Sequence, residues 1–550
     1  MSEAGKKQTF LHGAALLAMA TAVVKVIGFF YKIPLSAAIG NAGYGYFTVA
    51  YEIYTVLLMI STAGLPVAMS RMISQASSMG HYNQVQRIYK VSRAIFLTLG
   101  ILSTLIMVIG CRFLAVLLNQ PDAWAAILCL GPCALLMGLL CPYRGFFQGQ
   151  GNMRPTSNSQ MLEAVFKLVV GLGGAILVMQ LTGNVPLAAG GAIMGVTISC
   201  LVSVLYLRAV FVPAYRSLPQ GTDQALGNRQ TAKALLAIAI PITIGSAGLQ
   251  LLTVVESGMY MGKLVHLVES NLYMGHLVTE TMDAQTVADN IKGIYGQAMT
   301  VFNMPCAFIT PITISVIPAI TANLTLAKDA EVRSTEESAA RITGLLALPC
   351  AVGLFLLAKP VMGLLWGHTG HDLELGAQLM AVLGINVFLQ ATIQYTNALM
   401  QAHGYAHVPV INMLLCGIVK LAAVYVLVSN PNIGILGAPL GAFLCYTAIA
   451  ILNLTAIRRI VHQKPRLVSN LLRAAVPALI MGLAVYGTYW GLGHVLNVDG
   501  GRSQQLLLCG VPIFVGVVVY FIAAVKCKSI TREDCQLLPK GDKIAKLLKL

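Results

Sequence analysis

The chain alternates long apolar runs with short polar connections over most of its length. A helix needs about 20 mostly apolar residues to cross a hydrocarbon layer that is ~30 Å thick. Runs of that length, bounded by charged residues, Pro, Gly or Asn, predict fourteen membrane-spanning helices. Their approximate limits are 12–34, 46–70, 92–117, 123–146, 161–181, 187–211, 233–258, 293–322, 342–365, 376–400, 408–429, 435–457, 471–494 and 506–526. The pattern therefore predicts an all-α polytopic membrane protein.

Composition supports this class and argues against an enzyme. Of the 550 residues, 57% are hydrophobic and only 10% are charged, whereas a soluble domain carries about 25% charged residues. The longest polar connection, roughly 259–292, is shorter than the ~50 residues of the smallest domains. Function is therefore expected inside the helix bundle. The sequence has no P-loop and its 12 cysteines have no C-x-x-C spacing, so no cofactor, metal or disulfide is predicted.

The net charge of +16 is explained by the position of the basic residues. Most of the 36 Lys and Arg residues fall in every second connection, whereas the intervening connections carry only Arg112, Lys263, Lys359 and Arg502. Cytoplasmic loops of membrane proteins are enriched in Lys and Arg. The alternation predicts a multi-pass protein of the bacterial cytoplasmic membrane with both termini in the cytoplasm. The basic connections are expected to face membrane lipids, and no nucleic-acid partner is predicted.

Two short connections reveal an internal repeat. A shift of 253 positions superposes Gln148 on Gln401, Gly151 on Gly404 and Lys167 on Lys420. Six predicted spans separate the two connections, as duplication of a six-helix unit requires. The expected architecture is therefore two pseudo-symmetric six-helix lobes with two more helices. The predicted divisions are 1–230 for helices 1–6, 231–460 for helices 7–12, and 461–550 for helices 13–14 and a basic cytoplasmic tail.

Several segments resemble a known family. Lys25–Leu35, Gly43–Gly45 and Ser61–Ala68 are similar to the N-terminal signature of the MATE/MOP flippases, in the polysaccharide-transport branch that includes stage V sporulation protein B and lipid II flippases. Gly293–Met299 and Phe147–Glu163 are similar to further stretches of that family. The resemblance implies two lobes around a central cavity. It also implies transbilayer movement of an undecaprenyl-pyrophosphate-linked sugar, which is lipid II in the best-known members.

Ionisable residues within the predicted spans are candidates for the substrate cavity, because burying a charge in hydrocarbon is costly. Lys25 and Lys32 share one helix face, and residue counting places five of the candidates in the outer half of the membrane. Lysines suit a pyrophosphate, and the carboxylates could balance them or bind a coupling ion, H⁺ or Na⁺. The family resemblance implies arginines in this cavity. The resembling positions of this chain are lysines, which puts a bidentate contact with the pyrophosphate in question. The predicted substrate-binding residues are Lys25, Lys32, Glu52, Glu256, Lys292 and Lys420.

Simpler interpretations stay open for several of these residues. Lys32 and Lys292 could extend to the outer headgroups, and Glu52 could be interfacial. Glu163 and Lys167 are one helical turn apart and could neutralise each other within one helix. Lys420, the repeat counterpart of Lys167, has no acid at the equivalent position and needs another partner or water.

The two repeat-related connections are predicted to form a cytoplasmic gate. Its candidate residues are Arg144, Arg154, His403 and His407. His403 and His407 have spacing compatible with a metal ion, but no third ligand is nearby in the sequence, so no metal is predicted.

The sequence therefore predicts a flippase that moves an undecaprenyl-pyrophosphate-linked saccharide, such as lipid II or a related peptidoglycan or polysaccharide precursor, by alternating access. The alternative with the same fold is a cation-coupled multidrug antiporter of the MATE type. A membrane glycosyltransferase is disfavoured, because the sequence lacks an Asp-x-Asp motif and an extracytoplasmic domain. A sporulation role and a vegetative role are equally compatible with the sequence.

Overall fold

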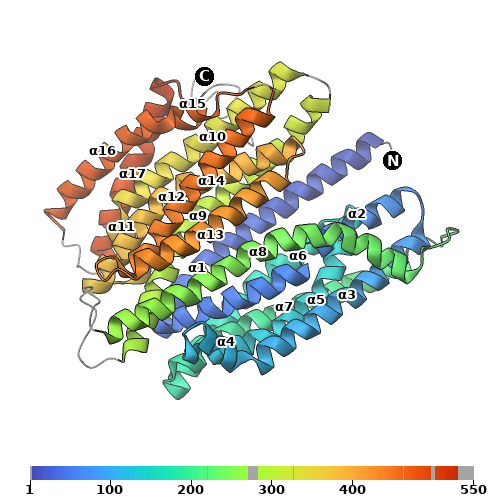
Figure 1. The fold of residues 1–550 in the computed structure, drawn as a ribbon, viewed down its shortest axis with the longest axis horizontal. Coiled ribbons are helices and arrows are strands. Elements are labelled where there is room, and N and C mark those ends of the chain that lie inside the picture. The colour runs from blue at the N-terminus through green and yellow to red at the C-terminus, as the bar shows by residue number, and fades with distance from the viewer. Residues whose placement is uncertain are drawn as a thin grey trace. The chain divides into compact units, whose positions relative to one another are not determined.

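The computed structural model describes residues 3–62, 64–219, 221–270, 283–325, 328–462, 464–496 and 502–530. All regular elements of these residues are helical (Figure 1). They are α1 (Glu3–Thr62), α2 (Leu65–Ser78), α3 (Tyr82–Ile109), α4 (Cys111–Leu117), η1 (Pro121–Ala123), α5 (Trp124–Gly149), α6 (Arg154–Thr182), α7 (Val185–Arg216), α8 (Asn228–Glu269), α9 (Ala284–Thr325), α10 (Asp329–Leu356), α11 (Ala358–Trp366), α12 (Gly370–Ala402), α13 (His407–Val428), η2 (Gly434–Leu436), α14 (Gly437–Ile460), α15 (Leu467–Leu471), η3 (Leu472–Ala474), α16 (Ala475–Gly493) and α17 (Arg502–Lys526). The prediction of an all-α membrane protein is confirmed.

Twelve helical segments of the described residues are long and apolar enough to cross a membrane. Large apolar side chains are exposed on their outer faces, including Leu181 (75%), Leu483 (75%) and Phe514 (70%). A water-exposed surface rarely carries so much apolar area, whereas lipid accommodates it. The predicted number of fourteen spans is close to this count.

The first helix holds two predicted spans. With 60 residues, α1 would be about 90 Å long at 1.5 Å per residue, which is far more than one crossing needs. Gly40 has φ 71° and ψ −178° and interrupts the helix between the two predicted runs. Only Gly adopts this backbone conformation readily. The second predicted span, 46–70, is too long at its end, because α1 ends at Thr62 and a separate helix, α2, begins at Leu65.

The helices form two compact units. Unit 1 comprises residues 1–265 and 283–293, and unit 2 comprises 266–282 and 294–550. In unit 1, α5 packs against α3, α7 and α1, and α6 packs against α7 and α1. In unit 2, α12 packs against α10, α11 and α14, and α16 packs against α17 and α10. Figure 1 shows α3, α5, α6 and α7 side by side in unit 1.

Both units contain the same sequence of helix packings, which confirms the internal repeat. The pairs α3·α5, α5·α7 and α6·α7 of unit 1 correspond to α10·α12, α12·α14 and α13·α14 of unit 2. A short helix follows the first long helix in each set, α4 in one and α11 in the other. The duplication therefore extends from the sequence to the order in which helices pack.

The repeat is most precise at the turns that end α5 and α12. Gly151 (φ 77°) and Gly404 (φ 85°) occupy the left-handed region that follows a helix C-terminus. Each turn is closed by three backbone hydrogen bonds, and each donor and acceptor of the second turn lies 253 positions after its counterpart. The pairs are Gln150→Phe146, Gly151→Gln148 and Asn152→Phe147 in the first turn, and His403→Leu399, Gly404→Gln401 and Tyr405→Met400 in the second.

Glycines bring α6 and α7 into direct backbone contact. Gly191 and Gly195 of α7 face Gly174 and Gly171 of α6, and a Cβ on Gly191 would lie 2.8 Å from the carbonyl oxygen of Gly174. This spacing is the small-residue pattern of close helix pairs in membranes.

Gly195→Ala should therefore destabilise unit 1. The added Cβ would overlap the backbone of Gly171, and such overpacking costs about 1–3 kcal/mol. Thermal unfolding in detergent should show a lowered midpoint. Gly173→Ala in α6 is the control, because its Cβ meets no atom within 4 Å and alanine favours the helix. Equal destabilisation by both variants would contradict this account of the α6–α7 contact.

Candidate functional site

A charged cavity lies within unit 1, between α1, α5 and α6. Its volume is about 290 Å³. α1 contributes one predicted site residue, Lys25, and α5 and α6 contribute the charged groups that face it. The lining residues are Thr21, Val24, Lys25, Ile27, Gly28, Tyr31, Arg144, Gln160, Glu163, Ala164 and Lys167. We call this cavity the unit 1 pocket.

Cations outnumber carboxylates in the unit 1 pocket. Arg144 donates from Nη2 to Oε2 of Glu163 at 3.0 Å and from Nε to Oγ of Ser159 at 3.0 Å. The only carboxylate among the described lining residues is therefore already paired with a cation. Lys25 and Lys167 remain as two positive charges in excess. A small polar cavity with this charge suits an anion, and a pyrophosphate is one such anion.

Lys167 is held against aromatic rings. Its Nζ lies 4.8 Å from the ring centroid of Tyr51 and 5.6 Å from that of Tyr31, both on α1. The negative face of an aromatic ring stabilises a nearby ammonium group. Lys32, which is half-buried on α1, lies near enough to Lys167 for the two charges to repel each other. The two rings thus hold Lys167 in place without neutralising it.

The expected ion pair between Glu163 and Lys167 within α6 is wrong. Glu163 pairs with Arg144 of α5 instead. The turn between α5 and α6 brings Arg144 opposite Glu163, and a guanidinium forms directed hydrogen bonds that an ammonium cannot match. Sequence reasoning consequently missed Lys167 as a pocket residue. Lys167 is the repeat counterpart of Lys420, a predicted site residue, and this relation could have identified it.

A second charged cluster in unit 1 surrounds Lys292 of α9. Its Nζ lies 3.2 Å from Oε2 of Glu52 on α1 and donates a hydrogen bond to Oγ of Ser257 on α8. The Tyr260 ring centroid lies 5.2 Å from the same Nζ. Lys292 is only 1% exposed. It is therefore a buried, paired charge, and the interpretation that it extends to the headgroups is wrong.

The predicted substrate-binding residues thus fall into separate places. Of the six, only Lys25 lines the unit 1 pocket. Glu52 and Lys292 form the second cluster, and Glu256 is buried beside it on α8 at 6% exposure. Lys420 is half-buried on α13 of unit 2. Residue counting along a helix gives depth but not the direction of a side chain, so it grouped charges that belong to two clusters.

The four predicted gate residues have different surroundings. Arg144 lines the unit 1 pocket, whereas Arg154 and His407 are exposed beside their turns. His403 Nε2 lies 2.6 Å from Oε1 of Glu336 on α10. Glu336 is fully buried and its backbone carbonyl accepts a hydrogen bond from the Tyr395 hydroxyl at 2.7 Å. Glu336 had no distinguishing signal in the sequence.

Removing the imidazole of His403 should destabilise unit 2. Oε2 of Glu336 already has no hydrogen-bond partner among the described atoms, so His403→Ala would leave the whole carboxylate unpaired. An unsatisfied buried polar group costs about 1–3 kcal/mol, and a charged one costs more. The unfolding midpoint in detergent should fall for His403→Ala and recover in His403→Ala/Glu336→Gln, which carries no buried charge. His407→Ala, at an exposed position, is the control. An unchanged midpoint for His403→Ala would contradict the assigned pair.

Unit 2 contains an apolar groove of about 810 Å³ between α10, α12, α14 and α16. Its lining includes Phe355, Phe388, Phe443 and Leu483 and has no charged residue among the described ones. The groove can hold a hydrocarbon chain but cannot bind a phosphate.

The comparisons with known proteins agree on one family. A family model described as "Polysaccharide biosynthesis protein" matches residues 10–324, and one described as "Lipid II flippase MurJ" matches residues 263–492. Stage V sporulation protein B of Bacillus subtilis (strain 168) is 25% identical over 538 residues, which cover 97% of this chain and 98% of that protein. Lipid II flippase MurJ of the same organism is 23% identical, with 93% and 94% of the two chains covered.

Solved structures show the same fold. The inward closed conformation of lipid II flippase MurJ has a TM-score of 0.65 at 13% identity and covers 93% of this chain and 98% of its own. The inward-facing conformation of a multidrug resistance MATE family transporter of the MOP superfamily has a TM-score of 0.62 at 15% identity, with 81% and 99% covered.

The apolar helices, the duplicated bundle and these relatives define a multi-pass bacterial membrane protein of the transporter and flippase class, which is not an enzyme. Within that class, the chain belongs to the family described as "Polysaccharide biosynthesis protein", whose model matches more than half of its length. The family resemblance found in the sequence is thereby confirmed.

Proposed function

We propose that this protein moves an undecaprenyl-pyrophosphate-linked saccharide across the cytoplasmic membrane by alternating access. The substrate would be lipid II or a related peptidoglycan or polysaccharide precursor. The pyrophosphate would bind in the unit 1 pocket, and the polyprenyl chain would stay in lipid.

The excess positive charge of the unit 1 pocket carries this proposal. Lys25 and Lys167 face a cavity whose one described carboxylate is paired with Arg144. A diphosphate bears the complementary charge, and both lysines can act as point-charge donors to its oxygens.

The same charge disfavours the alternative of a cation-coupled multidrug antiporter. A cationic drug would be repelled by two lysines that have no carboxylate of their own in the pocket. The fold alone is compatible with both functions, since this chain resembles solved structures of a MATE transporter and of MurJ.

The cluster around Lys292 is the proposed place for coupling to H⁺ or Na⁺. Glu52, Glu256 and Lys292 are buried or half-buried charges on three helices, α1, α8 and α9. A cation that binds to a carboxylate here would compete with Lys292 for it. Movement of the ion would thereby alter the contact that joins α1 to α9.

We extend the proposal to topology. Both termini would face the cytoplasm, with lobes at 1–230 and 231–460 followed by 461–550, and the turns that carry Arg154 and His407 would form part of a cytoplasmic gate. Cys527, an exposed cysteine just after α17, should then react with a membrane-impermeant maleimide in inside-out vesicles. Labelling in sealed right-side-out vesicles instead would invert the proposed orientation.

Reconstitution tests the substrate class directly. Liposomes that contain the purified protein should translocate fluorescent lipid II faster than protein-free liposomes and should not transport a cationic drug such as ethidium. Measurements with an imposed proton gradient, and separately with a sodium gradient, would identify the coupling ion. Transport of the drug without movement of the lipid would reject the proposed function in favour of the antiporter.

A further inference from the structure

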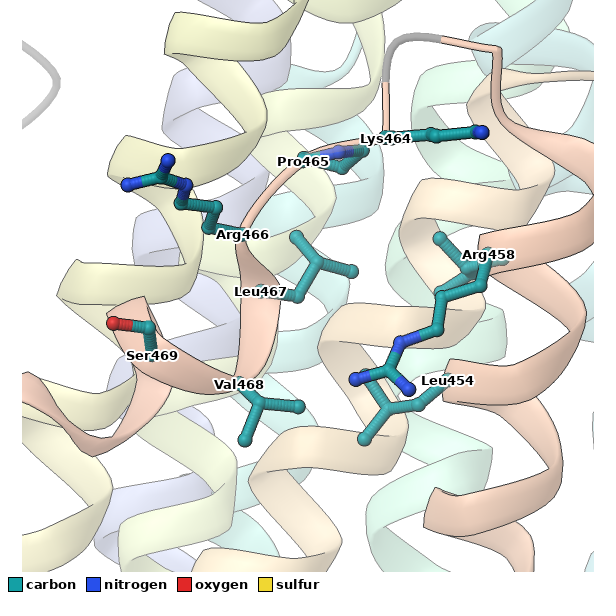
Figure 2. Close-up of a pocket in the computed structure, with 9 residues that line it drawn as sticks. Leu454, Arg458, Lys464, Pro465, Arg466, Leu467, Val468 and Ser469 are labelled. Atoms are coloured by element: carbon teal, nitrogen blue, oxygen red, sulfur yellow. The ribbon is translucent and has the colours of Figure 1, made fainter.

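Unit 2 contains a second charged pocket, well separated along the chain from the proposed substrate site. It has a volume of about 630 Å³ and lies between the last turns of α14 and the segment that leads into α15 (Figure 2). Its lining combines three basic side chains with apolar ones. The lining residues are Leu454, Ile457, Arg458, Lys464, Pro465, Arg466, Leu467, Val468 and Ser469.

Arg458 is the cation that reaches into this pocket. Figure 2 shows its guanidinium extending from α14 toward Val468. The side chains of Lys464 and Arg466 lie at the upper edge of the pocket and point away from each other. No acidic residue occurs among the described lining residues. The pocket therefore presents a guanidinium with two further positive charges at its edge.

Residues 464–466, which lead into α15, are held in a defined shape. The amide of Arg466 donates to Oε1 of Glu337 on α10 at 3.0 Å, and the same oxygen accepts from Nε of Arg333 at 2.9 Å. Lys464 has φ 44°, a left-handed conformation that is uncommon for a residue other than glycine. Glu337 thus fixes the backbone of the segment and is engaged by Arg333, so it does not neutralise Arg458.

The apolar half of the pocket has the character of a membrane-facing surface. Ile457 and Leu467 are buried beneath it, whereas Val468 is 39% exposed. α14 ends at Ile460, and the next candidate span begins at Leu467. The pocket therefore lies where two spanning segments end, which is the depth of lipid phosphates in a bilayer.

We propose that this pocket binds the headgroup phosphate of an anionic phospholipid. Arg458 would contact the phosphate, Lys464 would add positive potential at the rim, and the upper part of an acyl chain would lie against Leu454 and Val468. Basic pockets between membrane helices bind anionic headgroups in this way. A soluble phosphate would account for the cations but would leave the apolar half without a role.

Lipid-dependent thermal unfolding of the full-length protein in detergent tests the proposal. Phosphatidylglycerol, phosphatidylcholine and inorganic phosphate are titrated separately, and the half-saturating concentration is measured. The wild type should be stabilised by phosphatidylglycerol and not by the other two. Arg458→Gln/Lys464→Gln should raise the half-saturating concentration at least tenfold. Arg459→Gln is the matched control, because this neighbouring arginine is exposed but does not line the pocket.

Four results would overturn the proposal. Equal loss in Arg459→Gln would mean that general surface charge attracts the lipid. Equal stabilisation by phosphatidylcholine would assign the effect to acyl chains, and equal stabilisation by inorganic phosphate would assign it to a soluble anion. If the double variant unfolds without lipid, Ser469→Asp replaces it, because a carboxylate at this exposed lining position should repel the phosphate and produce the same tenfold loss. Unchanged lipid affinity in Ser469→Asp would then contradict the site.

Discussion

Replacement of both Lys25 and Lys167 by alanine should reduce the initial rate of lipid-linked saccharide translocation at least tenfold in proteoliposomes. The two residues supply the uncompensated charge of the unit 1 pocket. A tenfold effect corresponds to about 1.4 kcal/mol. Each charge-assisted hydrogen bond to a phosphate contributes about 1.5–3 kcal/mol, so the loss of two such bonds is sufficient to produce it. Each single variant should show a smaller reduction.

The matched control for this experiment is Lys90→Ala. Lys90 is exposed on α3 and is not a lining residue of the pocket, so its removal lowers the net charge without altering the site. Unfolding midpoints of all variants separate loss of function from loss of fold. Full translocation by a stably folded Lys25→Ala/Lys167→Ala protein would remove this pocket from the substrate pathway.

Replacement of Lys292 by methionine should have the largest effect on stability. Lys292 is 1% exposed and lies 3.2 Å from the carboxylate of Glu52, with Glu256 buried nearby. Removal of one partner from a buried ion pair costs about 3–5 kcal/mol, because the other charge is left without compensation. We expect strongly reduced yield of folded protein and a large fall in the unfolding midpoint in detergent.

A double variant distinguishes charge from packing in this prediction. Lys292→Met/Glu52→Gln removes both charges while it preserves much of the side-chain volume, and buried pairs are often replaced in this way at little cost. The double variant should therefore regain most of the stability lost by Lys292→Met. If it is as unstable as the single variant, the role of Lys292 is its packing against Tyr260 and not its charge.

The fold could be predicted from the sequence because lipid constrains it strongly. Spans need a fixed length of apolar residues, so the hydropathy pattern locates the apolar part of each long helix. It does not locate every helix end, because polar turns extend the helices: α10 begins at Asp329, whereas the predicted span begins at 342. The repeat was visible because its turns depend on glycine: Gly151 and Gly404 adopt the same left-handed conformation. The boundary between α1 and α2 was missed, since no charged residue occurs between Glu52 and Arg71, although Gly64 and Pro66 lie at the boundary.

The site could be predicted only in part. Lys25 was identified because a lysine in a span is conspicuous, but the partners of charged residues come from other helices. Helical spacing suggested Lys167 as the partner of Glu163, whereas the partner in the structure is Arg144 of the preceding helix. Glu336 is on a polar stretch of α10 that resembles an exposed helix end, although the side chain is fully buried. Such tertiary contacts leave no periodic signal in a single sequence.

The central claim is that the unit 1 pocket binds a pyrophosphate. Equilibrium binding of a short-chain prenyl pyrophosphate to the detergent-purified protein tests it most directly, with wild type and Lys25→Ala/Lys167→Ala compared over a range of ionic strength. We expect at least tenfold weaker binding by the variant and a shallower dependence of its affinity on salt, because two charges that attract the ligand are lost. Equal affinity and equal salt dependence of the two proteins would contradict it.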